Sequence, residues 1–163
     1  MRVVRIKYFI CVFLAIISFG TYAQGQWRVQ NERQVTLAYG APSTGITVFA
    51  ITYPSNDCRP IASIIAFTGS ELGRAISQVS TTRTSEQMIW MIDGVSFSSR
   101  TAKTEHSNGF EIAMYAPNGL VEKIPTARNI SVTFAGREII SNIPFITEGF
   151  VRANNEAIST CRG

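Results

Sequence analysis

The chain has few of the residues that build catalytic and metal sites. Its 163 residues include one histidine and three cysteines, and charged residues make up 16% of the total. A catalytic triad needs a nucleophile, a base and an acid that orients the base, and pairing His106 with any one of many serines has almost no specificity. The acidic residues are scattered singly, and the motifs of common hydrolases and phosphate-binding loops are missing. The sequence therefore predicts no catalytic residue, no metal site and no cofactor site.

Long apolar runs are also missing, except for one near the N-terminus. Three basic residues precede the apolar run 9–19, and small residues follow at the positions that a signal peptidase reads. The run is well short of the roughly 20 residues that a membrane span needs. We therefore expect residues 1–23 to be a cleaved secretory signal. The mature chain, residues 24–163, is then a single exported domain, periplasmic or extracellular, without stable membrane insertion.

The excess of positive charge is concentrated in that leader. Three of the 15 basic residues and none of the 11 acidic ones lie in the first 23 residues, which leaves a net charge of +1 on the remainder. Binding to nucleic acid needs a basic patch, and no run of Lys or Arg follows the leader. Nucleic acid is therefore not an expected partner.

Two cysteines, Cys58 and Cys161, remain after the leader. An oxidising compartment and an even number of cysteines make a disulfide the default. Two free thiols or intermolecular pairing are the alternatives. We predict an internal bridge between these two residues, which attaches the C-terminal segment to the first half of the fold.

The rest of the mature chain has the pattern of an antiparallel β protein. Segments of alternating or continuous apolar residues, rich in Val, Ile, Thr and Phe, are separated by turns containing Gly, Pro and Asn. Residues 46–53 are apolar on both faces, which is typical of a central strand that is buried on both sides. The other predicted strands cover residues 24–31, 34–39, 61–67, 110–115, 130–134 and 139–143.

A hairpin over residues 88–99 is the clearest local signal. It contains Asp93-Gly94, a dipeptide suited to the two-residue type I′ turn because both central residues need positive φ. In this register Ile92 lies opposite Val95, and Trp90 lies opposite Phe97 on the same face. Asp93 is therefore expected to have a structural role.

Helices are expected in three places. Residues 70–79 predict a short helix, with a long hairpin arm as the alternative, and residues 120–127 predict a short helical or irregular crossing. The C-terminal segment predicts an amphipathic helix with Thr147 as its N-cap. Its predicted buried stripe runs through Phe150, Ala153, Ala157 and Cys161, and Val151 and Ile158 widen it. The expected fold is mainly β, a β-sandwich or barrel-like antiparallel sheet, with this C-terminal helix packed on it.

The C-terminal third also carries a family resemblance. The C-terminal segment resembles the tail of small exported bacterial proteins of the invasion-associated locus B type. The matching positions are Gly149-Phe150, Ala153 and Cys161, and the Met-Ile-Asp-Gly hairpin precedes them. This resemblance implies an exported, β-rich, non-enzymatic protein with a role at the cell envelope or at a host interface. It transfers no catalytic residues.

We therefore expect a small exported binding protein whose partner is another protein, of the envelope or of a target cell. The alternative is a periplasmic enzyme inhibitor, or a small hydrolase with a site that the fold assembles near His106. The polar segment 99–108 is expected to be an exposed loop. The predicted interaction surface on the hairpin and this loop consists of Trp90, Asp93, Gly94, Phe97 and His106.

Overall fold

The computed structural model of the chain describes residues 26–30, 32–41, 45–79 and 87–163. The predicted signal sequence, residues 1–23, lies outside the described residues.

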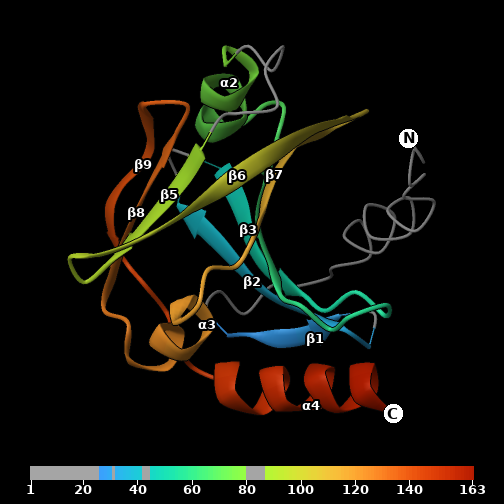
Figure 1. The fold of residues 1–163 in the computed structure, drawn as a ribbon. Coiled ribbons are helices and arrows are strands. Elements are labelled where there is room, and N and C mark those ends of the chain that lie inside the picture. The colour runs from blue at the N-terminus through green and yellow to red at the C-terminus, as the bar shows by residue number, and fades with distance from the viewer. Residues whose placement is uncertain (1–25, 31, 42–44, 80–86) are drawn as a thin grey trace.

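In the described part of the chain, nine antiparallel strands form one curved sheet in the order β1-β2-β3-β4-β7-β6-β5-β8-β9 (Figure 1). This confirms the predicted class, an antiparallel β fold with a C-terminal helix. Among the described strands, β1 and β9 are the two edges of the sheet. In chain order the strands are β1 (Arg28–Gln30), β2 (Gln34–Ala41), β3 (Gly45–Thr52), β4 (Ile61–Phe67), β5 (Gln87–Ile92), β6 (Val95–His106), β7 (Gly109–Tyr115), β8 (Asn129–Phe134) and β9 (Arg137–Pro144).

Strand β6 joins the two halves of the sheet. Its first half pairs with β5, from Val95 to Arg100, and its second half pairs with β7, from Thr101 to His106. The prediction of an exposed loop over residues 99–108 is therefore wrong for most of that segment. The segment is polar because one face of β6 is largely exposed to solvent. Its polar residues therefore indicate an exposed strand and not a loop.

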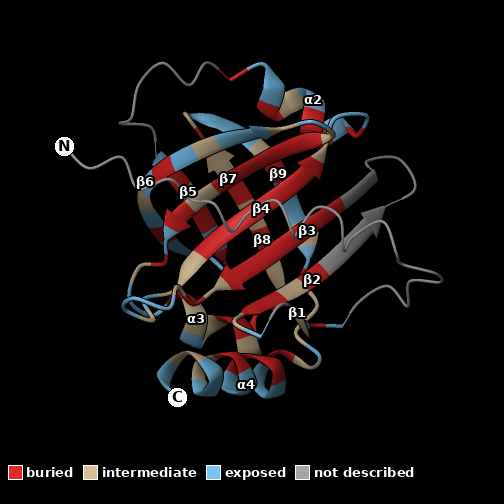
Figure 2. Cartoon of the chain, turned by 90° about the vertical axis from the view of Figure 1, so that its right-hand side faces the viewer, coloured by how far each residue is buried: buried red, intermediate tan, exposed pale blue. Residues whose placement is uncertain are grey.

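The central strands are buried on both faces, as predicted for β3. Five consecutive residues of β4 are buried, and β3 and β4 are almost continuously red in Figure 2. On one face Phe49 and Ile64 pack into the main core, together with Trp90. Continuous apolar sequence is what a strand covered on both faces requires.

The hairpin between β5 and β6 has the predicted register, with Trp90 opposite Phe97 and Ile92 opposite Val95. Asp93 and Gly94 both have positive φ, at 49° and 80°. The local turn chemistry therefore determines this part of the fold.

Helices cover the two ends of the sheet. Helix α2 (Glu71–Ser77) lies at one end, and helices α3 (Leu120–Lys123), η1 (Ile124–Thr126) and α4 (Phe150–Arg162) lie at the other (Figure 1). The predicted helix over residues 70–79 is confirmed, and its N-cap is Ser70, whose side chain accepts a hydrogen bond from the Gly73 amide. Residues 120–126 form the predicted helical crossing.

Helix α4 begins two residues later than a cap at Thr147 implies. Its N-cap is Gly149, which has a φ of 79°, a conformation that glycine adopts without strain. A Cβ at this position would also lie 2.8 Å from the carbonyl oxygen of Trp27. The Trp27 ring packs edge-on against Phe150 at 4.9 Å, and its indole nitrogen donates to the Ile146 carbonyl. Close contact with Trp27 therefore sets the start of the helix.

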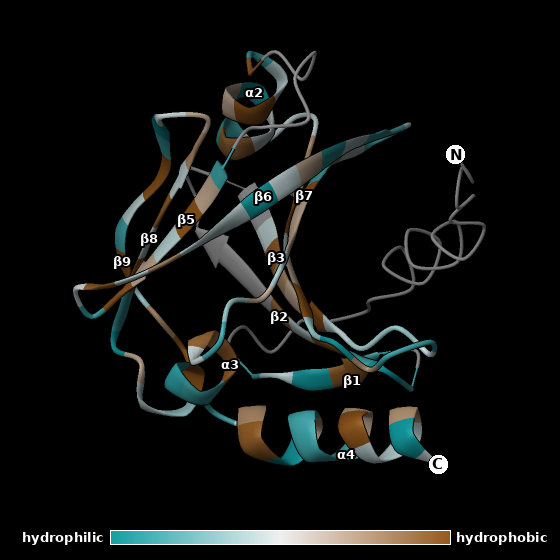
Figure 3. Ribbon diagram, in the orientation of Figure 1, coloured by the Kyte–Doolittle hydropathy of each residue, from teal (hydrophilic) through white to brown (hydrophobic). Residues whose placement is uncertain are grey.

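The buried stripe of α4 is narrower than predicted. Phe150, Ala153 and Ala157 are buried, whereas Val151 is 54% exposed. Hydrophobic and hydrophilic residues alternate along the helix in Figure 3, and its buried face rests on the end of the sheet next to β1.

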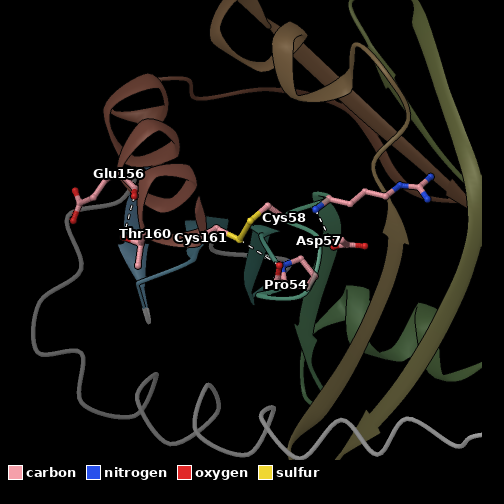
Figure 4. Close-up of a disulfide and its surroundings, with 7 residues drawn as sticks. Pro54, Asp57, Cys58, Glu156, Thr160 and Cys161 are labelled. Carbon is pink, nitrogen blue, oxygen red and sulfur yellow. Dashed lines mark hydrogen bonds between the residues drawn. A yellow bond between two sulfur atoms is a disulfide. The ribbon is translucent and has the colours of Figure 1, made fainter. Parts of the chain in front are cut away.

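The predicted disulfide between Cys58 and Cys161 is present and spans 103 residues of sequence. Figure 4 shows that it joins the turn after β3 to the last turn of α4. The Cys161 sulfur also lies 3.3 Å from the carbonyl oxygen of Pro54. Because an oxidised sulfur has no proton to donate, this is a packing contact. The bridge therefore fixes the C-terminal end of α4 against the sheet.

Removing the bridge should lower stability. In the Cys58→Ala/Cys161→Ala variant we expect the free energy of unfolding to fall by about 2–4 kcal/mol, because the unfolded chain regains the freedom of a long loop. Urea denaturation measures this, and wild-type protein unfolded with a reductant is the control and should match the variant. An unchanged unfolding midpoint would show that the bridge does not hold the helix.

Candidate functional site

The residues predicted to form an interaction surface do not lie together on the surface. Trp90 is fully buried and Phe97 is 9% exposed, and both belong to the core. Asp93 lies at the hairpin tip, where its carboxylate accepts hydrogen bonds from the backbone amides of Arg128 and Asn129. These hydrogen bonds are the main reason that the pKa of Asp93 is lowered. The hairpin residues therefore serve the fold, as expected for Asp93.

His106 lies at the other end of β6, beside a buried carboxylate. Its Nε2 is 3.6 Å from Oε2 of Glu111, which is 4% exposed. Burial raises the pKa of Glu111, and the nearby Ser63 hydroxyl and the His106 ring oppose this shift. The Ser63 hydroxyl is close to the carboxylate without making a full hydrogen bond to any described residue. These three side chains project from one face of β4, β7 and β6.

Their spacing does not match a serine hydrolase. Ser63 lies opposite Ala113 on β7, and Ala113 lies opposite Ala102 on β6. His106 is four residues farther along β6, so the α-carbons of Ser63 and His106 are roughly 15 Å apart. A base must come within about 3 Å of the hydroxyl that it deprotonates, and Glu111 lies between the two. This arrangement is better suited to neutralising a buried carboxylate.

Other site classes also find no support in the described part of the chain. No group of three or more His, Cys, Asp or Glu side chains is placed to hold a metal ion within these residues. None of the described helices is long and apolar enough to cross a bilayer.

A hollow on the described surface lies beside the disulfide and has a volume of about 410 Å³. One wall is α4. The other wall consists of residues that follow Cys58, residues 116–118 after β7, and the α3–η1 segment. We call this the α4 groove. Its apolar lining includes Pro60, Pro117, Val121, Pro125, Val151 and Ile158.

A buried polar pair lies at the floor of the α4 groove. The Tyr53 hydroxyl donates a hydrogen bond to Oδ1 of Asn154, and the two residues are 3% and 9% exposed. Burial raises the pKa of Tyr53 to about 12, and the charge of Glu122 acts in the same direction. Tyr53 therefore keeps its proton at neutral pH and remains a donor. The amide nitrogen of Asn154 forms no hydrogen bond with another described residue, and it is not fully buried, so water can satisfy it.

Charged side chains line the same groove. Arg59 and Arg162 each follow a half-cystine, and both belong to the lining. The Arg59 guanidinium stacks on the exposed ring of Tyr115 at 4.6 Å, which restricts its motion. Neither arginine forms an ion pair with a described residue, and Glu122 on α3 is the acidic residue of the lining.

Reasoning from the sequence missed this groove, although one signal pointed to it. The predicted disulfide sets the residues after Cys58 against the end of the last helix. The second wall, formed by α3 and residues 116–118, has no comparable signal, because nothing local in the sequence says which face of α4 it meets.

The Tyr53–Asn154 pair can be tested at high pH. Because the pKa of Tyr53 is raised from 10.0 to about 12, its contribution to stability is complete below pH 10 and is lost as the pH rises from 10 to 12. In Tyr53→Phe this alkaline loss of stability should be shallower. At neutral pH the variant should lose about 1–2 kcal/mol, because the Asn154 oxygen loses its donor.

Denaturant unfolding at a series of pH values measures both effects. Tyr115→Phe is the matched control, since it removes a hydroxyl from a tyrosine that is 46% exposed, and it should leave the wild-type profile unchanged. Identical alkaline profiles for Tyr53→Phe and wild type would contradict the assignment.

No protein-family model, no curated protein and no solved structure matches the chain. The resemblance of the C-terminal third to proteins of the invasion-associated locus B type stays a prediction.

Proposed function

We propose that the mature chain is a small exported binding protein, without a catalytic role, that holds an extended segment of a partner protein in the α4 groove. The partner is another protein of the envelope or of a target cell. The observation that carries this proposal is the groove itself, a hollow of mixed apolar and polar lining with a buried hydrogen-bonded pair in it and a covalent bridge between its walls. The disulfide is compatible with export.

The length of the groove favours an extended peptide. Side chains that line it run along α4 from Phe150 to Arg162, which corresponds to about 18 Å along the helix axis. An extended chain of about five or six residues covers that distance. A small molecule of a few atoms would leave most of the groove unfilled.

The chemistry of the lining also suits a protein segment. Prolines and branched aliphatic side chains offer apolar surface, and Asn154 offers amide donors to a backbone carbonyl. Binding sites commonly combine an apolar lining with a few placed polar groups. Val151 adds a large apolar side chain that is 54% exposed on the rim, where burial by a partner would be favourable.

Variants of two exposed valines can show whether the groove or the hairpin is the binding surface. Val151 lines the groove and Val95 lies at the hairpin tip, and the two are 54% and 46% exposed. Peptides selected from a random displayed library against the oxidised mature protein serve as probes. We expect Val151→Asp to weaken their binding at least tenfold, because a charge enters the apolar lining, and Val95→Asp to leave it unchanged.

Fluorescence anisotropy of the labelled peptides measures these affinities, and thermal unfolding shows that both variants fold. The proposal fails if Val151→Asp binds the peptides as wild type does. Loss of binding in Val95→Asp alone would place the interaction surface on the hairpin instead.

A further inference from the structure

We infer that the Cys58–Cys161 bond is a redox clasp: a dithiol reductant opens it while the sheet stays folded, and opening releases the last turn of α4. The clasp does not depend on the proposed function, because it opens whether or not a peptide lies in the α4 groove. For that function its consequence is that the wall along α4 is fixed at both ends only in the oxidised protein.

Both half-cystines lie at the surface of the molecule. Cys58 and Cys161 are half-buried, and the four residues adjacent to them in sequence are all exposed. Figure 4 shows the bond between the turn after β3 and the last turn of α4, and Cys58 also lines the groove. Access to the sulfur is one of the factors that set the rate of thiol–disulfide exchange. A reagent thiolate therefore reaches this bond without unfolding of the sheet.

The last part of α4 has little else to hold it. Its buried residues end at Ala157, and of the six residues that follow, Ile158 and Cys161 are half-buried and the others are exposed. The first turn is held separately, by contact with Trp27. Segments with few buried contacts open locally at low cost. The bridge is therefore the main attachment of residues 158–162 to the rest of the fold.

The backbone at Cys58 also favours opening. Its φ is 51°, in the left-handed region, which is unfavourable for a residue that has a side chain. The Cys58 amide donates a hydrogen bond to the Pro54 carbonyl and closes the turn, so this hydrogen bond and the disulfide together hold the conformation. Reduction removes one of these two constraints.

Opening the clasp takes a dithiol and no other reactant. One thiolate of the dithiol attacks a sulfur of the cystine, forms a mixed disulfide and displaces the other cysteine as a thiolate. The second thiolate of the reagent then attacks the mixed disulfide and displaces the first cysteine. The cystine gains two electrons and takes up the two protons of the dithiol, which is oxidised to its own disulfide.

Reduction of the folded protein tests the clasp without any peptide. The oxidised mature protein is incubated with dithiothreitol in the absence of denaturant, and alkylation followed by mass spectrometry gives the rate at which thiols appear. Ile64→Val, in the fully buried core of β4, should be reduced at the wild-type rate. If reduction needs global unfolding, this variant should be reduced about fivefold faster, because its unfolded population is larger, and that result overturns the clasp.

Hydrogen exchange measures what the opening releases. We expect amides 158–162 to exchange at least tenfold faster in the reduced protein than in the oxidised one, while β3 and β4 stay protected. Reoxidation should restore the slow exchange, and Cys58→Ser/Cys161→Ser should match the reduced wild type with or without dithiothreitol. Equal exchange at the end of α4 in both states overturns the clasp. Loss of protection in β3 and β4 also overturns it, because the bond then secures the whole fold.

The peptides selected for the oxidised protein show the consequence for binding. Their affinity should fall at least tenfold on reduction. If a peptide whose binding depends on Val151 binds the reduced protein equally well, the control of the groove by the clasp is wrong and the proposed function stands. If no peptide binds either form, the proposed function fails, and the rates of reduction and hydrogen exchange still decide the clasp.

Discussion

The covalent bond between Cys58 and Cys161 is the constraint on which α4, and with it the groove, depends. The buried face of α4 is small, because its buried residues are Phe150, Asn154 and two alanines. Alanine buries little apolar surface, so hydrophobic contact alone holds this helix weakly. The chain therefore fixes both ends by other means: Gly149 packs against Trp27 at the start, and the cystine holds the last turn. A groove with one wall on such a helix keeps its shape only while both attachments are intact.

Most of the fold could be predicted because its determinants are local. The turn at Asp93-Gly94 needs two positive φ values, which the dipeptide supplies, and the register of the β5–β6 hairpin follows from it. Strands β3 and β4 are recognisable because continuous apolar sequence fits a strand buried on both faces. The disulfide was predicted from the number of cysteines that follow the predicted signal sequence. Each of these inferences uses information that lies within a short stretch or in a simple count.

The errors arise where neighbours from elsewhere in the chain decide the outcome. The polar segment ending at His106 is a strand because β5 and β7 both supply pairing partners, and its polarity reflects solvent on one face. Thr147 is not the helix cap because the carbonyl of Trp27, far away in sequence, requires a glycine at position 149. Trp90 and Phe97 are aromatic residues near a turn, and such residues occur both in binding surfaces and in cores. Only the packing of the whole sheet shows that these two belong to the core. The groove is formed by three separate segments of the chain, so no single stretch of sequence predicts it.

Two buried polar groups have a structural role. Glu111 is buried beside His106 and Ser63, and these neighbours favour its charged form, so the arrangement compensates for the cost of burying a carboxylate. Asn154 is different, because its oxygen is satisfied by Tyr53 while its amide nitrogen has no acceptor among the described residues. That nitrogen is not fully buried, so water can satisfy it and Asn154 carries no unmet cost of burial. Both polar groups are therefore explained by the fold: Glu111 by the neighbours that favour its charge, and Asn154 by its hydrogen bond to Tyr53, which ties α4 to the end of β3.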